Sequence, residues 1–237
     1  MAPIHFGCLL FDYQPIDVLG PTDLVNTANR RYMQSISAIS RVDKDTIACA
    51  PEIVFHHIST TLDPVHLDSS TLTIVPTTTV DDCPEMDYLL IGGPDPATFK
   101  LHPELAGFIR RHVAAGKTLF TNCSGSAVVA STGVLNGKKA TVNNVAYQLV
   151  KEVYPDVQWT KETKWVIDGN IWTAGGAISG MDMFAYWLKE NFGMDVLIHA
   201  ASLLDFEPRD INGVMNVIPK RYDDKGKQLF THTFPLD

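Results

Sequence analysis

Short apolar runs alternate with amphipathic segments along most of this chain of 237 residues. The apolar runs predict strands at residues 4–10, 87–91, 118–121, 157–160, 164–167 and 171–173, the last two joined by an Asp-Gly-Asn turn. Amphipathic spacing predicts helices at 21–28, 103–114, 145–153, 179–191 and 195–204. Weaker patterns at 35–39, 47–50 and 72–75 are interpreted as further strands.

The regular alternation of strands and helices predicts an α/β fold with a mainly parallel sheet covered on both faces. A content of 45% hydrophobic and 19% charged residues suits one compact domain, residues 1–237. The polar last stretch, 219–237, is interpreted as a C-terminal tail. Its pattern fits an edge strand and equally a segment that packs on a partner subunit.

One segment, residues 118–130, combines a strand, a cysteine and a helix in immediate succession. The strand ends at Asn122, and the small residues from Ser124 onward allow the sharp strand-to-helix turn that is typical of a nucleophile elbow. Free N–H groups at the start of the helix are expected to favour thiolate over thiol and to lower the pKa of Cys123. The alternative is that Cys123 is a small buried apolar residue, as free cysteines commonly are.

Glycines follow several of the predicted strands, at the edge of the sheet where ligands collect in such folds. Gly93 comes shortly after the strand at 87–91, and further glycines follow the strand at 171–173. Since glycine lets a ligand approach the backbone closely, the N–H groups of Gly93 and Ser124 are expected to form an anion hole beside the sulfur. Any one of these glycines alone is better explained by a turn, so the prediction depends on their occurrence together.

Acidic residues outnumber basic ones by 27 to 19, which gives a formal net charge of −8. Because Lys and Arg do not cluster, nucleic acid and membrane partners are disfavoured, and a small-molecule substrate is expected. The cysteines, at positions 8, 49, 83 and 123, are widely spaced, which indicates neither a disulfide scaffold nor a zinc site. The first apolar stretch has no basic leader and is too short to span a bilayer, so the chain is interpreted as cytoplasmic.

Five motifs occur in order along the chain, at residues 17–21, 92–93, 122–125, 133–141 and 175–182. Together they resemble the DJ-1/PfpI superfamily and, within it, the isocyanide hydratase branch. The resemblance covers about residues 4–208. It implies a flavodoxin-like three-layer α/β/α sandwich, a cysteine at the nucleophile elbow and a homodimer.

The resemblance also gives roles to residues outside the elbow. In the hydratase branch a carboxyl group from the end of the first strand sits beside the sulfur, and Asp17 matches that position; a raised pKa would let it donate and accept the proton. Many members carry a histidine where this chain has Asn143, so a Cys-His-acid triad is not supported and Asn143 becomes a candidate substrate-binding residue. His232 in the tail is the histidine that a partner subunit could still supply.

These residues predict a cysteine-dependent enzyme that acts on a small electrophile. The most concrete reaction is hydration of an isocyanide to an N-formamide, with Cys123 as nucleophile, Asp17 as acid and base, and no metal or organic cofactor. One alternative is a glyoxalase-type or other specialised-metabolite lyase on the same scaffold. Another is a non-enzymatic redox sensor or chaperone that responds to oxidation of Cys123.

Overall fold

Seven strands form the central sheet in the computed structural model, which describes residues 2–210, 213–215, 225 and 227. They lie in the order β10–β11–β7–β6–β1–β2–β5. Their bounds are β1 (Ile4–Leu9), β2 (Ile53–Ser59), β5 (Thr78–Thr79), β6 (Tyr88–Ile91), β7 (Thr118–Asn122), β10 (Trp165–Asp168) and β11 (Ile171–Ala174). Neighbouring strands are parallel except for the antiparallel pair β10–β11, which confirms the prediction of a mainly parallel sheet.

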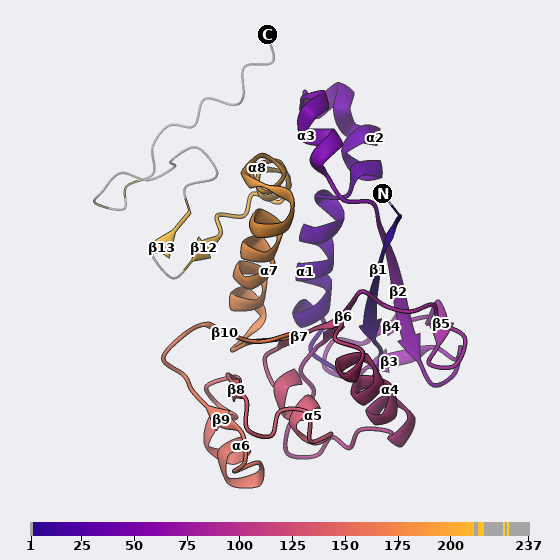
Figure 1. The fold of residues 1–237 in the computed structure, drawn as a ribbon, viewed down its shortest axis with the longest axis vertical. Helices are drawn as coiled ribbons and strands as arrows, with labels where there is room; N and C mark the ends of the chain where they lie inside the picture. The colour runs from indigo at the N-terminus through magenta and orange to yellow at the C-terminus, as the bar shows by residue number, and fades with distance from the viewer. Residues whose placement is uncertain (1, 211–212, 216–224, 226, 228–237) are drawn as a thin grey trace.

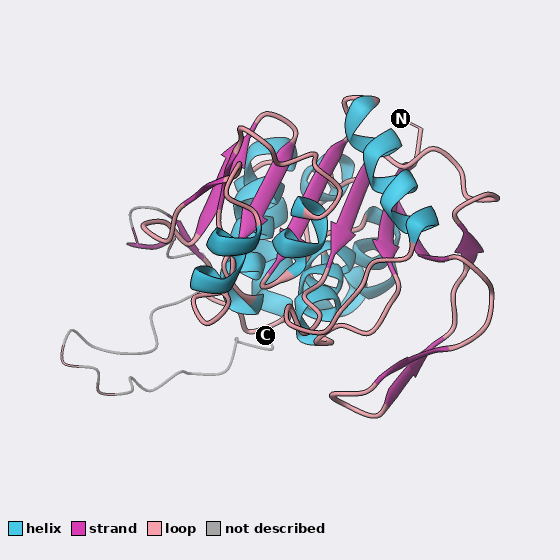
Figure 2. Ribbon diagram, turned by 90° about the horizontal axis from the view of Figure 1, so that it is seen from below, coloured by secondary structure: helices cyan, strands magenta, loops and turns pink. Residues whose placement is uncertain are grey.

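Helices cover both faces of this sheet (Figures 1 and 2). On one side α1 (Ile16–Thr27), α7 (Ala177–Phe192) and α8 (Met194–Leu203) pack against one another, and on the other lie α4 (Pro103–Ala114) and α5 (Gly125–Ala130). Between the sheet and α7 the core is aromatic, with the rings of Phe120 and Phe184 centred 4.5 Å apart. The expected flavodoxin-like α/β/α sandwich is confirmed.

Two of the predicted strands are wrong, because both segments are helical. Residues 35–39 lie in α2 (Arg30–Ser40), and 47–50 coincide largely with α3 (Lys44–Cys49). Each helix begins at a side-chain cap: Asn29 accepts a hydrogen bond from the N–H of Arg31, and Asp43 accepts from Asp45 and Thr46. Such caps satisfy the free N–H groups of the first turn and define the helix start locally, a signal that the apolar pattern alone does not contain.

The sequence pattern also missed β2, an interior strand of the sheet. Two adjacent histidines, His56 and His57, lie in the middle of this strand and interrupt its apolar run. The strand expected at 72–75 is present as β4 (Leu72–Ile74), but it pairs antiparallel with β3 (Val65–Leu67) outside the central sheet. Two further short pairs join β8 (Lys139–Ala140) to β9 (Gln158–Trp159) and β12 (Arg209–Asp210) to β13 (Gly213–Val214).

The first helix starts earlier than predicted, at Ile16 instead of Pro21. Proline is favoured at the first position of a helix, which is why the sequence suggested a start there. In the structure Pro21 lies inside α1, and Asp17 therefore lies in the first helical turn. The other expected helices are confirmed, including α6 (Tyr147–Val153); the expected tail, 219–237, lies outside the described residues apart from 225 and 227.

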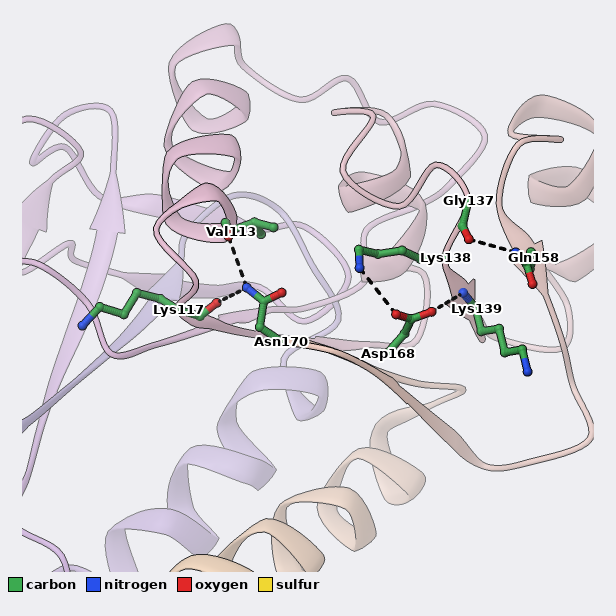
Figure 3. Close-up of polar contacts among 8 residues, drawn as sticks. All are labelled: Val113, Lys117, Gly137, Lys138, Lys139, Gln158, Asp168 and Asn170. Carbon is green, nitrogen blue, oxygen red and sulfur yellow. Dashed lines mark hydrogen bonds and ion pairs between the residues drawn. The ribbon is translucent and has the colours of Figure 1, made fainter.

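Side chains of the turn between β10 and β11 contact the end of α4, the loop before β7 and the start of β8 (Figure 3). Asn170 donates hydrogen bonds from Nδ2 to the carbonyl oxygens of Val113, at 3.2 Å, and Lys117, at 2.7 Å. Asp168 accepts from the N–H of Lys139 at 2.9 Å and lies 3.4 Å from Nζ of Lys138. These contacts hold the β10–β11 hairpin, and with it the start of α7, in a fixed place beside β7.

Replacing Asn170 with alanine should therefore destabilise the fold without affecting the elbow. The partly buried carbonyl groups of Val113 and Lys117 lose their shared donor, and the free energy of unfolding should fall by about 1–2 kcal/mol. Urea denaturation of the wild type and of N170A measures this difference. Unchanged stability would mean that water replaces the amide at no cost.

Candidate active site

The nucleophile elbow lies where β7 ends and α5 begins. Cys123 has a positive φ of 57°, a conformation that residues other than glycine rarely adopt, and its N–H donates to the carbonyl of Ala174 at 3.0 Å. Gly125 follows so closely behind β6 that a Cβ there would lie 2.5 Å from the carbonyl oxygen of Ile91. The small residues after the cysteine are thus required by contact with the neighbouring strand, and Cys123 is left half-buried at the end of the sheet.

Asp17 lies beside this cysteine and is completely buried. Its Oδ2 accepts a hydrogen bond from the N–H of Gly93 at 3.0 Å, while Oδ1 has no N–H or O–H donor in the part of the chain that the structure describes. Burial raises the pKa of Asp17 to about 6, against the lowering effects of the Gly93 N–H and of a hydrogen bond with the Cys123 thiol. The carboxyl group can therefore exchange a proton near neutral pH, next to the sulfur.

The pKa of Cys123 is raised, so the expectation of a lowered thiol pKa was wrong. Burial has the largest effect, and the negative charge of Asp17 adds to it. The N–H group of Ser124 and the side chain of Asn143 act in the opposite direction without reversing the shift. The sequence identified the helix start correctly but gave no measure of the desolvation or of the neighbouring carboxyl group.

The two residues expected to form an anion hole make other contacts. The N–H of Gly93 is already donated to Asp17, and a Cβ at Gly93 would lie 2.6 Å from Oγ of Ser124. The hydroxyl of Ser124 donates to the carbonyl of Pro94 at 2.5 Å, so its single proton is not available to the sulfur at the same time. Of the expected pair, only the N–H of Ser124 faces the sulfur.

Asn143 approaches the sulfur from the segment after β8. Its backbone N–H donates to the carbonyl of Cys123 at 3.4 Å, and its Oδ1 accepts from the N–H of Val145 at 2.9 Å. Because Oδ1 is held in this way, the NH₂ group is the part of the amide that can donate to the sulfur, which agrees with its lowering effect on the pKa of Cys123. The residue found where many relatives carry histidine is thus a neutral hydrogen-bond donor at the site.

A cavity of about 830 Å³ opens in front of the sulfur. Asp17 is completely buried and is not part of the cavity wall. The residues that line it, besides Gly93, Cys123, Ser124 and Asn143, come mainly from the segments 12–16, 94–96 and 145–149 and include Tyr13, Ile16, Val145 and Leu149. Sequence reasoning missed these wall residues; the only signal for them was their place just after predicted strands and at the start of a predicted helix.

Histidine is absent from the described residues that line this cavity. His112 is buried on α4, where a ring nitrogen lies 2.8 Å from the carbonyl of Thr118, and His232 lies outside the described residues. Within the described part of the chain, no three His, Cys, Asp or Glu side chains are grouped so as to hold a metal ion. No helix there is long and apolar enough to cross a membrane.

The burial of Asp17 predicts a stability gain when its charge is removed. Its pKa is about 6 in the folded protein, against an ordinary value of 3.8, so its contribution to stability is fully present below about pH 4 and is lost as the pH rises through 6. At pH 7 the D17N variant should unfold with a free energy up to about 3 kcal/mol higher than the wild type. The difference should disappear toward pH 4 in chemical denaturation; a D17N that is less stable at pH 7 would contradict this.

Comparisons with known proteins agree with this architecture. The DJ-1/PfpI family model matches residues 36–190. Isonitrile hydratase of Pseudomonas putida is 29% identical over 207 residues, which cover 86% of this chain and 79% of that protein. The HTH-type transcriptional regulator GbdR of Pseudomonas aeruginosa is 24% identical over 139 residues, 59% of this chain and 38% of the regulator.

Among solved structures, a ThiJ/PfpI family protein from Pseudomonas syringae superposes with a TM-score of 0.68 at 22% identity. The superposition covers 89% of this chain and 78% of the other, so the two proteins share the fold. The family match spans more than half of the chain and includes the whole elbow around Cys123. The chain belongs to the DJ-1/PfpI family.

Proposed function

We propose that this protein hydrates a small isocyanide to the corresponding N-formamide, with Cys123 as nucleophile and Asp17 as acid and base. The observation that carries the proposal is the buried carboxyl group of Asp17 next to a thiol that opens onto a cavity. The similarity to an isonitrile hydratase over 86% of the chain supports the same chemistry.

In the first step the terminal carbon of the isocyanide accepts both a nucleophile and a proton. The sulfur of Cys123 forms the S–C bond while the proton shared between the thiol and Asp17 moves to the same carbon, which gives a thioimidate. The NH₂ group of Asn143 and the N–H of Ser124 face the sulfur and stabilise the negative charge it carries before the bond forms. Asp17 then holds no proton.

In the second step water completes the reaction. The carboxylate of Asp17 assists removal of a proton from water, the oxygen adds to the thioimidate carbon, and the nitrogen is protonated. The S–C bond then breaks, the carbonyl of the formamide forms, and the hydroxyl proton returns to the sulfur and Asp17 pair. The sum is one isocyanide and one water consumed for one N-formamide, with the enzyme unchanged.

The site is less suited to amide hydrolysis. An expelled amine must be protonated, and in Cys-His enzymes the imidazole supplies that proton. In this chain Asn143 is the residue beside the sulfur, and an amide side chain cannot act as an acid. Addition of water to an isocyanide has no leaving amine, so a thiol and one carboxyl group suffice.

We also propose a cytoplasmic homodimer. Ile16 and Leu19 on α1 are 42% and 39% exposed, and Val145 at the cavity mouth is 95% exposed. Apolar side chains left exposed on neighbouring segments are typical of surfaces that a partner subunit covers.

The formal charge of −8 suits a protein whose substrate is a small molecule.

The direct test is product analysis with a simple isocyanide. The wild type should form the N-formamide, C123A should form none, and D17N should lose about 100-fold or more in kcat/KM because the proton donor is gone. C49A is the matched control, since Cys49 is an exposed cysteine on α3, away from the cavity. Its activity should equal that of the wild type.

The same preparation also tests the two alternatives. Lactate from methylglyoxal without any formamide would favour the glyoxalase-type lyase, and a thiol that is readily oxidised to sulfinate without either product would favour the redox sensor. Formamide production that persists in C123A would contradict the proposed nucleophile.

The charge of the cavity predicts which isocyanides react best. Asp12 and Asp95 line it, and the described wall contains no Lys, Arg or His. The N–H of Ala97 and the hydroxyl of Thr98 hold the pKa of Asp95 below its usual range, so that carboxylate stays ionised. An isocyanide that bears a carboxylate should therefore react about threefold to tenfold less efficiently than a neutral one of equal length.

The variant D95N should narrow this difference in kcat/KM, and added salt should narrow it too because the charges face solvent. D23N is the matched control, because Asp23 lies on α1 outside the cavity wall. Equal rates for the anionic and neutral substrates at low salt would contradict a role for the cavity charge in specificity.

A further inference from the structure

A proline inside α1 leaves the backbone of Asp17 without its helical partner. In an α-helix the carbonyl of residue 17 accepts a hydrogen bond from the N–H of residue 21. Residue 21 is Pro21, which has no N–H to donate. The carbonyl group of the proposed acid therefore needs a donor from elsewhere in the protein.

That donor is the side chain of Asn122, the residue directly before the nucleophile. Its Nδ2 donates to the carbonyl oxygen of Asp17 at 2.6 Å, across 105 positions of sequence. Both Asn122 and Asp17 are completely buried, so water does not compete for this contact. The side chain of Asn122 thus links the backbone of Asp17 to the strand end that carries Cys123.

The amide of Asn122 occupies a confined place, and its position leaves its oxygen atom without a hydrogen bond. A Cβ at Gly180 on α7 would lie 2.3 Å from Oδ1 of Asn122, so any larger residue there would displace the amide. That Oδ1 is itself buried and has no hydrogen-bond partner among the described residues. Burying an unpaired amide oxygen is unfavourable, and an apolar side chain of similar shape would avoid it. The presence of an amide at this position is therefore explained by its NH₂ group, which donates to the carbonyl of Asp17.

We propose that Asn122 is a positioning residue that fixes the carboxyl group of Asp17 against the sulfur of Cys123, in place of the helical hydrogen bond that Pro21 removes. Its role as an aid to catalysis rests on the proposed function; its effect on the thiol does not. If the carbonyl of Asp17 loses its donor, the first turn of α1 can shift, and the distance from the carboxylate to the sulfur changes. The negative charge of Asp17 raises the pKa of Cys123, so a looser contact makes the thiol more acidic.

The test uses N122L, which keeps a branched side chain of similar size but has no donor. The rate of Cys123 alkylation by iodoacetamide is measured from pH 5 to 10 by mass spectrometry of the intact chain. At pH 7 N122L should react about threefold to tenfold faster than the wild type, with its pH profile shifted toward that of D17N. Its kcat/KM for the isocyanide should fall about tenfold.

Restoring the missing N–H provides the decisive comparison. In P21A the alanine can donate the helical hydrogen bond to the carbonyl of Asp17, so the double variant P21A/N122L should regain the alkylation profile of P21A. T121V is the matched control: Thr121 is the neighbouring residue on β7, equally buried, and its hydroxyl has no hydrogen-bond partner within the described residues. Its alkylation profile should match that of the wild type.

Two outcomes would overturn the proposal: a wild-type alkylation profile in N122L, or a shifted profile that P21A fails to restore. If N122L does not fold, N122A removes the same donor with a smaller change in volume and is read in the same way. Alkylation requires no isocyanide, so a wild type that makes no formamide would refute the proposed reaction and still leave the positioning role to be decided.

Discussion

The site depends on one proton held between a buried carboxyl group and a half-buried thiol. The carboxyl group of Asp17 and the thiol of Cys123 are both desolvated, and each negative charge disfavours the other. Two such groups in contact do not ionise together at neutral pH, so the pair titrates as a unit and keeps one proton between them. The neighbouring donors, the N–H groups of Gly93 and Ser124, are placed one on each partner.

The scaffold produces this contact by bringing together pieces that are far apart in sequence. Asp17 comes from α1 on one face of the sheet and Cys123 from the end of β7, and the parallel register of β1, β6 and β7 sets these chain ends side by side. Close approach requires the small residues Gly93 and Gly180, because a Cβ at either would collide with the site. These two glycines thus reflect packing around the pair. The buried charge of Asp17 lowers the stability of the fold.

Most of the architecture could be predicted from the sequence, because strand and helix periodicities are local. The elements that could not be predicted depend on other information: side-chain caps decide α2 and α3, and β2 is an interior strand despite its histidine pair. At the site, Cys123 was identified by its turn and Asp17 through family resemblance. The sign of the thiol pKa shift was missed, because desolvation depends on residues that only the fold brings near.

A shared proton suits an electrophile whose single carbon must accept a nucleophile and a hydrogen. A freely ionised thiolate would supply the nucleophile without the proton. A solvated thiol would supply neither the nucleophile nor the proton fast enough. Because the pKa of Cys123 is raised and that of Asp17 is near 6, the nucleophilic sulfur and the proton are held side by side. The proton can therefore follow the sulfur to the same carbon atom. The raised thiol pKa, which would count against a hydrolase of the Cys-His type, is therefore what the proposed addition requires.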